Sequence, residues 1–300
     1  MREVFLSIGE CMVEMAPQEG GLYAMGFAGD TFNTAYYLRA CLPQGWEVQY
    51  LTAVGTDAVS DRLCAFMNDC GVRTDHVIRR ADRTVGLYMI ELKGAERSFS
   101  YWRSMSAAKT LAQDPMPLRA ALAGARVAYF SGITLAILPS EDRAGFLAEV
   151  ARARAQGVTV AFDPNLRPRL WANSAEMCAA IMQAAAVADI VLPSFEDEAA
   201  FFGDATPLAT AQRYLQAGAG VAVVKDGANP CHLVTPSGVT TFAPAPVATV
   251  VDTTAAGDSF NAGFLAAYLA QMPAAAALKA GADVAAQVIS ARGALVSLHP

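Results

Sequence analysis

From about residue 125 onward, short apolar runs alternate with longer stretches of helical character. The apolar runs cover residues 127–130, 158–162 and 190–192, and helical stretches cover 140–156 and 174–186. This alternation is typical of repeated βαβ units. Each run is continuously apolar instead of alternating with polar residues, as expected for parallel strands buried on both faces. The pattern predicts an α/β fold with helices on both sides of a mostly parallel sheet.

The ends of the helical stretches carry residues that often start or stop helices. Ser140 and Ser174 precede acidic residues and are candidate N-caps. Gly157 and Gly218 follow helical stretches, where a left-handed C-terminal cap is usual. We therefore expect helices that start after the serines and end at the glycines.

Two segments, about 11–28 and 85–104, depart from this rhythm. The second contains two alternating, aromatic-rich runs, 86–92 and 98–103, which predict a hairpin. Exposed antiparallel strands alternate in this way, whereas core parallel strands do not. We expect the two segments to form a small β-sheet that projects from a single domain of residues 1–300 and acts as a lid over a site.

Composition and charge favour a cytoplasmic protein that binds small molecules. Alanine supplies much of the 54% hydrophobic fraction, and the longest apolar stretches are broken well before the ~18 residues of a membrane span. The first apolar run stops at Gly9 and Glu10, too early for a signal peptide. A net charge of −6 without runs of Lys and Arg argues against a nucleic-acid surface or a basic membrane patch. Six scattered cysteines and three histidines show no zinc spacing, so we expect reduced cysteines.

A loop of small residues opens a helix near the end of the chain. A β-rich run, 247–251, leads into residues 252–258, whose sequence is Asp-Thr-Thr-Ala-Ala-Gly-Asp, and a helical stretch follows to residue 269. Unpaired backbone N–H groups at a helix start attract phosphate oxygens. Asp258, in the first turn, fits three tasks there: a carboxylate that complements the helix dipole, a metal ligand, or a base for a hydroxyl that meets a phosphoryl group.

Other known phosphate-binding motifs are missing from the sequence. There is no Gly-x-x-x-x-Gly-Lys-Ser/Thr loop and no His-Arg-Asp or Asp-Phe-Gly motif of protein kinases. Lys225, Asp226 and Gly227 follow the apolar run 221–224. These three residues fit either an ordinary strand-end turn or a glycine-permitted turn that lies against a nucleotide.

Residues 252–258 resemble the C-terminal signature Asp-Thr-x-Gly-Ala-Gly-Asp of the ribokinase-like (PfkB) carbohydrate kinases. Other motifs of this family occur in order over nearly the full chain, at residues 28–35, 54–57, 162–168 and 225–227. The resemblance implies a ribokinase-like three-layer α/β/α sandwich with a mostly parallel central sheet and a small β-sheet lid. It also implies an ATP-dependent kinase of a small sugar.

Within the family, the chain most resembles members that phosphorylate the sugar acid 2-keto-3-deoxygluconate to 2-keto-3-deoxy-6-phosphogluconate. Four segments carry this resemblance: residues 9–14, 29–31, 101–103 and 167–171. Arg103 and Arg167 are the chemical reason to prefer an acid, because a guanidinium fork suits a carboxylate. Arg103 also fits a solvated hairpin end, and kinases of fructose resemble residues 165–168 as well. A kinase of a neutral ketose such as fructose and a non-catalytic sugar-binding protein are the alternatives.

The resemblance implies that Asp258 is the catalytic base and that the N–H groups of Ala255, Ala256 and Gly257 form an anion hole. A carboxylate near a helix N-terminus is expected to be a weak base, so Asp258 would mainly orient the hydroxyl. The family usually has glycine in place of Ala255, and we expect this alanine to hold a negative φ. The implied substrate contacts, besides Asp258, are Gly29, Asp30, Asn33, Tyr88, Arg103 and Arg167.

The resemblance also implies binding partners. Nucleotide contacts fall on Ser194, Lys225, Gly227, Ala256 and Gly257. Magnesium is expected because it bridges nucleotide phosphates. Where the family often has Asn-x-x-Glu, this chain has Ser194 and Asp197, so Asp197 is the candidate in the magnesium network.

Two further expectations concern a cation and the assembly. The family binds a monovalent cation such as K⁺ at the positions of Asp252 and Thr254. The exposed strands of the lid invite edge pairing, so we expect a homo-oligomer.

Overall fold

A nine-stranded sheet forms the centre of the protein in a computed structural model that describes residues 3–93 and 96–299. The strand order is β15-β14-β13-β12-β11-β10-β1-β4-β6, and every neighbouring pair from β6 to β13 is parallel, whereas β14 and β15 pair antiparallel. The strands are β1 (Glu3–Ile8), β4 (Trp46–Leu51), β6 (Val72–Arg73), β10 (Val127–Ser131), β11 (Thr159–Asp163), β12 (Ile190–Val191), β13 (Val221–Val224), β14 (Cys231–Thr235) and β15 (Gly238–Phe242).

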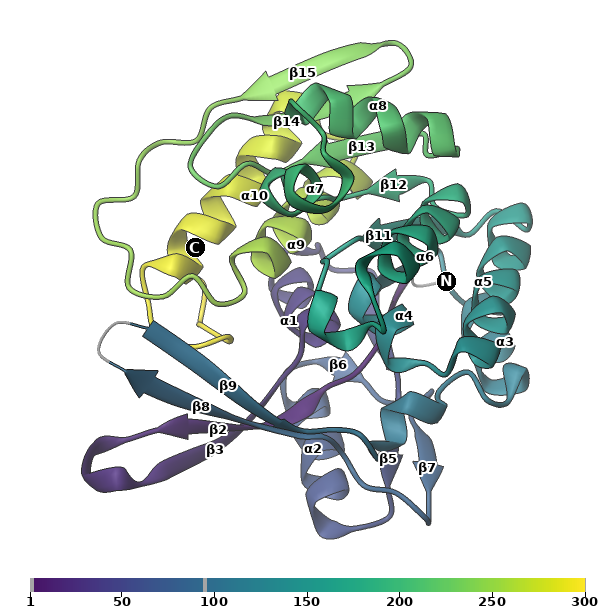
Figure 1. Ribbon diagram of the computed structural model, residues 1–300, viewed down its shortest axis with the longest axis vertical. Helices are drawn as coiled ribbons and strands as arrows, with labels where there is room; N and C mark the ends of the chain where they lie inside the picture. The colour runs from purple at the N-terminus through teal and green to yellow at the C-terminus, as the bar shows by residue number, and fades with distance from the viewer. Residues whose placement is uncertain (1–2, 94–95, 300) are drawn as a thin grey trace.

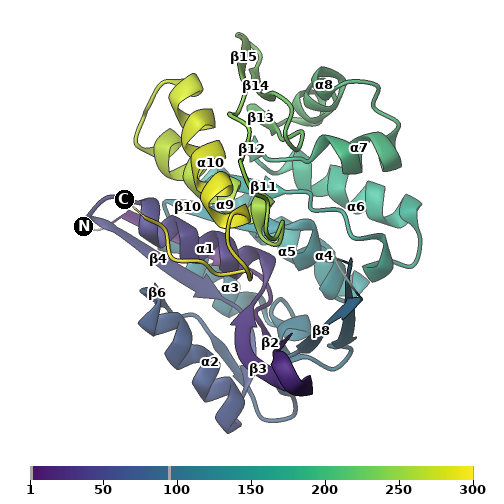
Figure 2. The same ribbon diagram turned by 90° about the vertical axis from the view of Figure 1, so that its left-hand side faces the viewer.

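Helices cover both faces of this sheet, as Figure 2 shows edge-on. One face carries α1 (Asp30–Cys41), α2 (Ala58–Asp69), α9 (Ala256–Leu269) and α10 (Ala274–Ile289). The other carries α3 (Pro115–Ala123), α4 (Gly132–Ile137), α5 (Ser140–Ala155), α6 (Ser174–Ala186), α7 (Phe195–Phe202) and α8 (Pro207–Ala217). The predicted three-layer α/β/α arrangement is confirmed.

Two hydrophobic cores lie on opposite faces of the sheet, and each central strand contributes to both. In β10, Ala128 and Phe130 belong to the core under α3–α8, whereas Val127 and Tyr129 belong to the core under α1, α2, α9 and α10. All four side chains are fully buried. Burial on both faces explains why the strands appear in the sequence as continuous apolar runs.

The helix starts differ from the prediction by one residue. Ser140 and Ser174 are the first residues of α5 and α6, and the residues that cap these helices are Pro139 and Asn173. The Asn173 side chain accepts a hydrogen bond from the Glu176 N–H at 2.9 Å. The predicted serine caps are therefore wrong, because the residue before each serine has a non-helical backbone and takes the cap position.

The helix ends follow the prediction. Gly157, after α5, has φ 95°, and Gly218, which caps α8, has φ 118°. Both values lie in the left-handed region that favours glycine.

The run at 247–251 was predicted to be β-rich, and it forms no strand. The Val251 N–H donates to the Ile289 carbonyl of α10 at 2.8 Å instead of to a neighbouring strand. Val250 and Val251 are 55% and 47% exposed. The prediction is wrong because the valines here favour a strand locally, but the segment has no strand beside it to pair with.

A second, four-stranded sheet projects from the body (Figure 1), in the order β3-β2-β8-β9. Its strands are β2 (Met12–Pro17), β3 (Tyr23–Ala28), β8 (Leu87–Lys93) and β9 (Glu96–Trp102). The tip of the predicted hairpin, residues 94–95, lies outside the described residues. A small pair, β5 (Ala53–Gly55) with β7 (Ile78–Arg80), lies at the base. Within residues 3–93 and 96–299, no helix has the length and hydrophobicity of a membrane span.

Candidate active site

The candidate site lies at the carboxyl edge of the large sheet. Strand β1 pairs with β4 on one side and with β10 on the other, so the chain winds in opposite directions from this point. In open α/β sheets, ligands bind in the crevice that forms at such a switch point. Asp163 ends β11 and Lys225 follows β13, so both side chains start from this edge.

Two helix starts, those of α1 and α9, meet at this edge. Asn33 in the first turn of α1 donates from Nδ2 to Asp258 Oδ2 of α9 at 2.8 Å. The Thr34 hydroxyl donates to the backbone carbonyl of Asp258 at 3.3 Å. Asp30, the first residue of α1, accepts from Asn165 Nδ2 at 2.8 Å. The structure thus brings Asp30, Asn33 and Asp258 together, although the first two are 225 or more residues from the third.

Glycine is required where the chain enters α1. A Cβ atom on Gly29 would lie 2.2 Å from the carbonyl oxygen of Glu10, so no other residue fits without moving the backbone. The Gly29 N–H donates to Asn33 Oδ1 at 3.3 Å. The residue therefore fixes the orientation of the Asn33 amide, whose other end donates to Asp258.

The surroundings of Asp258 change its acidity. Burial is the largest cause that raises the pKa of Asp258, to about 7, and the negative charge of Asp30 adds to it. The hydrogen bond from Asn33 and the charge of Lys225 oppose the rise. Burial also raises the pKa of Asp30. The expectation that the α9 start makes Asp258 a weak base is wrong, because burial and a second carboxylate outweigh the helix dipole, and a pKa near 7 suits a base that works at neutral pH.

The loop before α9 contains a left-handed alanine. Ala255 has φ 60° and ψ 16°, so the expectation of a negative φ is wrong. A left-handed conformation costs an alanine about 1 kcal/mol relative to glycine, which explains the glycine usual in the resembled family. The Ala256 N–H donates to the Thr253 carbonyl at 3.2 Å. The next two N–H groups, of Gly257 and Asp258, come before the first helical hydrogen bond, which Ser259 donates to Ala255, and they can bind an anion.

Lys225 lies beneath this loop in a buried polar cluster. Its Nζ donates to Asn261 Oδ1 at 3.0 Å and to Asp163 Oδ2 at 3.4 Å. Asn261 Nδ2 donates in turn to Asp163 Oδ2 at 2.7 Å and to the Tyr129 hydroxyl at 3.2 Å. All four residues are more than nine-tenths buried. Gly227, with φ 55°, makes the turn that follows.

Ser194 and Asp197 lie at the start of α7. The backbone of Ser194 forms a parallel bridge with Lys225, so the ends of β12 and β13 stay side by side. Asp197 Oδ2 lies 3.7 Å from Arg167 Nη1, and burial raises the pKa of Asp197. In the part of the chain that the structure describes, no three His, Cys, Asp or Glu side chains converge as a metal site. A magnesium ion held mostly by nucleotide phosphates needs only one or two protein carboxylates, and Asp197 fits that requirement.

The two arginines have different carboxylate partners. Arg103, whose side chain is 12% exposed, forms an ion pair with Glu10, whose side chain is 1% exposed. Arg103 is therefore not a solvated hairpin end. Arg167 is 52% exposed and pairs with Asp197.

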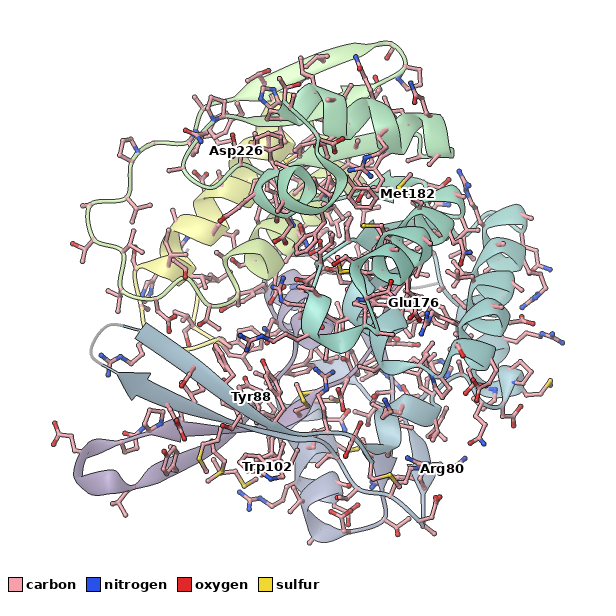
Figure 3. All side chains as sticks on the ribbon, viewed as in Figure 1. Arg80, Tyr88, Trp102, Glu176, Met182 and Asp226 are labelled. Atoms are coloured by element: carbon pink, nitrogen blue, oxygen red, sulfur yellow. The ribbon has the colours of Figure 1, made fainter. Side chains whose placement is uncertain are left out.

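Two glutamates of the site were missed in the sequence. Glu10 follows β1 and binds Arg103, and Glu14 in β2 accepts a hydrogen bond from the Tyr88 hydroxyl of β8. Figure 3 shows Tyr88 on the small sheet. An acidic residue at the end of an apolar run was the available signal, since Glu10 lies two residues after β1 and Asp163 is the last residue of β11.

Asp252 joins the anion loop to the C-terminal segment. Its Oδ1 accepts from the Thr254 N–H at 3.1 Å and from the Thr254 hydroxyl at 2.8 Å. Its Oδ2 accepts from the Gly293 N–H at 2.7 Å. The monovalent cation expected at Asp252 and Thr254 stays a prediction.

The arrangement combines a carboxylate of raised pKa with an anion-binding helix start and a nearby buried ammonium group. Such a site can accept the proton of a hydroxyl while an anionic group is held beside it.

Comparisons with known proteins agree with this chemistry. The family model described as pfkB family carbohydrate kinase matches residues 5–299. A 2-dehydro-3-deoxygluconokinase of Dickeya dadantii is 39% identical, over 97% of this chain and 96% of that protein. One of Haemophilus influenzae is 36% identical, over 96% of this chain and 94% of that protein. The crystal structure of a PfkB protein from Polaromonas sp. JS666 superposes with a TM-score of 0.85 at 29% identity, over 97% of this chain and 96% of that one.

Proposed function

The chain belongs to the pfkB family of carbohydrate kinases, and from this premise we propose that it transfers the γ-phosphoryl group of ATP to 2-dehydro-3-deoxygluconate, also called 2-keto-3-deoxygluconate. The product is 2-keto-3-deoxy-6-phosphogluconate, phosphorylated on the terminal hydroxyl. The observation that carries the proposal is the Asp258 carboxylate, held by Asn33 at the anion-binding start of α9. The two gluconokinase relatives, which align over nearly the full chain, support the choice of sugar.

Asp258 acts as the base for the sugar hydroxyl. The hydroxyl oxygen forms a bond to the γ-phosphorus, the bond from that phosphorus to the β-phosphate oxygen breaks, and the hydroxyl proton passes to Asp258. Asn33 orients the carboxylate at 2.8 Å, and burial, together with the charge of Asp30, raises its pKa to about 7. Phosphoryl transfer has a loose transition state, so orientation and charge neutralisation supply most of the acceleration.

The nucleotide lies on the side of β12 and β13, where Ser194 and Gly227 line its path. The N–H groups of Ala256 and Gly257 receive the phosphoryl oxygens once the contact between Ala256 and Thr253 opens. Magnesium neutralises phosphate charge when it enters with ATP, and Asp197 would hold it. A monovalent cation beside Asp252 and Thr254 would support the loop.

Arg103 and Arg167 recognise the carboxylate of the sugar acid, and Tyr88, Gly29 and Asp30 bind its other polar groups. Arg103 is the stronger candidate, because its guanidinium is nearly buried and held by Glu10. Buried donors discriminate strongly between ligands, since a ligand without an acceptor leaves them unpaired.

A substrate comparison tests the proposed function. We expect kcat/KM for 2-keto-3-deoxygluconate to exceed that for fructose by about 10²-fold or more, because fructose leaves the arginine donors unpaired. ADP release by purified protein with ATP and each sugar is the measurement. A preference for fructose would instead establish the neutral-ketose alternative, and the lack of any sugar-stimulated ADP release would establish the non-catalytic one.

The four-stranded sheet is proposed to close over the sugar as a lid and to join subunits in a homo-oligomer. Its strands β3 and β9 are edges, and Tyr23, Tyr101 and Trp102 on them are exposed. Figure 3 shows Trp102 on this sheet. Exposed apolar side chains beside open edges favour association with a second copy. We expect light scattering to give at least twice the mass of the chain, and a monomeric mass would contradict the assembly.

A further inference from the structure

We propose that Lys225 is a catalytic residue whose ammonium group contacts the phosphoryl group during transfer. The inference rests on the proposed function, since it assigns a role within the same reaction. It goes beyond a nucleotide contact made by the turn at 225–227, because the side chain points away from that turn into the protein, beneath α9.

The backbone of Lys225 is held firmly in place. Its N–H donates to the Pro193 carbonyl at 2.9 Å, and its carbonyl accepts from the Phe195 N–H at 2.8 Å. The side chain is 10% exposed. The ammonium group therefore starts from a fixed point on the large sheet and has little freedom to move.

The ammonium group faces the first turn of α9. A lysine has three donors, and Asp163 and Asn261 accept from two of them. A Cβ atom built on Gly257 would lie 3.6 Å from Lys225 Nζ, so no side chain of that residue separates the ammonium from the helix start. The third donor is thus available to an anion bound at the N–H groups of this turn.

The partners of Lys225 compensate its charge and orient its side chain. A buried ion pair is seldom the most stable way to fill a core, because both charges lose their hydration. Here Asp163 compensates the charge, and Asn261 contacts both members of the pair with its amide. Burial raises the pKa of both Asp258 and Asp197, and the charge of Lys225 opposes each rise, so its field reaches both the proposed base and the proposed magnesium side.

The ammonium group of Lys225 lies beside the site at which negative charge would develop during the reaction. As the bond to the sugar oxygen forms and the bond to ADP breaks, negative charge spreads over the three equatorial oxygens of the phosphoryl group. The N–H groups of α9 approach these oxygens from the helix, and Lys225 approaches them from the sheet. A fixed donor in such a place acts mainly on the transition state.

Lys225→Met tests the proposal, because it removes the charge and keeps much of the volume. We expect kcat to fall about 10²- to 10³-fold, as for the loss of one oxyanion donor, with little change in KM for the sugar. Calorimetry should show that MgADP still binds, whereas the added affinity for MgADP with aluminium fluoride and sugar is lost. Lys279→Met is the matched control, since Lys279 pairs with Asp283 on the exposed face of α10, and it should leave kcat unchanged.

A second variant separates catalysis from folding. Lys225→Met leaves Asp163 as an unpaired buried charge and can lower the melting temperature. Lys225→Met with Asp163→Asn removes both charges, so we expect the melting temperature to recover while kcat stays low. Recovery of kcat to within tenfold of the native value in this double variant would overturn the proposal.

The substrate and the role of Lys225 can fail separately. If the native protein phosphorylates fructose and not the sugar acid, the proposed substrate is wrong, and the same variants measured with fructose still decide on Lys225. If the native protein transfers no phosphoryl group to any sugar, both proposals are overturned.

Discussion

Asp258→Asn is expected to lower kcat by about 10³-fold, within the range that one positioned general base contributes. The amide oxygen can still accept the hydrogen bond from Asn33, so the local geometry is kept while the proton acceptor is lost. Initial rates of ADP release at saturating ATP and sugar give the comparison. Asp283→Asn, in an exposed ion pair on α10, is the control and should retain the native rate. Native turnover by Asp258→Asn would show that the base lies elsewhere.

The same substitution is expected to stabilise the folded protein at neutral and alkaline pH. Burial and the charge of Asp30 raise the pKa of Asp258 to about 7 in the folded chain, from its ordinary value of 3.8. The folded state therefore favours the protonated form. The stability tied to that proton is complete below about pH 4 and is lost as the pH rises to about 7.

An asparagine carries no such charge, so the gain in stability should grow between pH 4 and 7 and then level off. We expect it to reach a few kcal/mol at pH 8, on the order set by a shift of this size. Urea unfolding of both proteins at pH 5 and pH 8 measures it. An equal difference at the two pH values would contradict the raised pKa.

Arg103→Gln is expected to lower kcat/KM for the sugar acid by about 10²- to 10³-fold, the range for removing one partner of a buried charge pair. The value for fructose should change less than about threefold, because a neutral sugar has no carboxylate for the guanidinium to bind. Kinetics with both sugars give the ratio. Arg119→Gln, which removes an Arg–Glu pair between α3 and α5, is the matched control.

Arg103 also holds the buried Glu10, so a loss of activity could come from an unpaired Glu10 alone. Glu10→Gln combined with Arg103→Gln removes both charges and should keep the selective loss for the acid. An equal loss of kcat/KM for both sugars in this double variant would mean that Arg103 only stabilises the part of the small sheet that joins the body.

Local patterns in the sequence were enough for most of the fold. Helix α6 covers the predicted range 174–186, and β13 covers the predicted run 221–224. These elements can be predicted from residues close in sequence. A helix produces a periodic pattern of apolar positions, and a strand buried on both faces produces a continuous apolar run. The run at 247–251 failed for the opposite reason, since a strand needs a partner that the sequence alone does not reveal.

The chemistry of the site depends on contacts between distant segments, and the sequence could predict only part of it. The motif at 252–258 indicated an anion site with a carboxylate. The raised pKa of Asp258 comes from burial and from Asp30 at the other end of the chain, and the partner of Arg103 is a glutamate that precedes it by 93 positions. The left-handed backbone of Ala255 follows from the path by which the loop enters α9. The residue types beside Ala255 do not indicate this path.

The hydrogen bond between Asn33 and Asp258 joins residues 225 positions apart. This separation has consequences for folding during synthesis. On the ribosome, α1 and every strand of the large sheet are synthesised before α9. At that stage Asp30 and Asn33 are present without Asp258, the proposed base. The repulsion between the two carboxylates therefore arises only when α9 docks on a largely assembled body. Kinase activity therefore requires the docking of α9, and a nascent chain that has not completed this step is expected not to consume ATP on sugar.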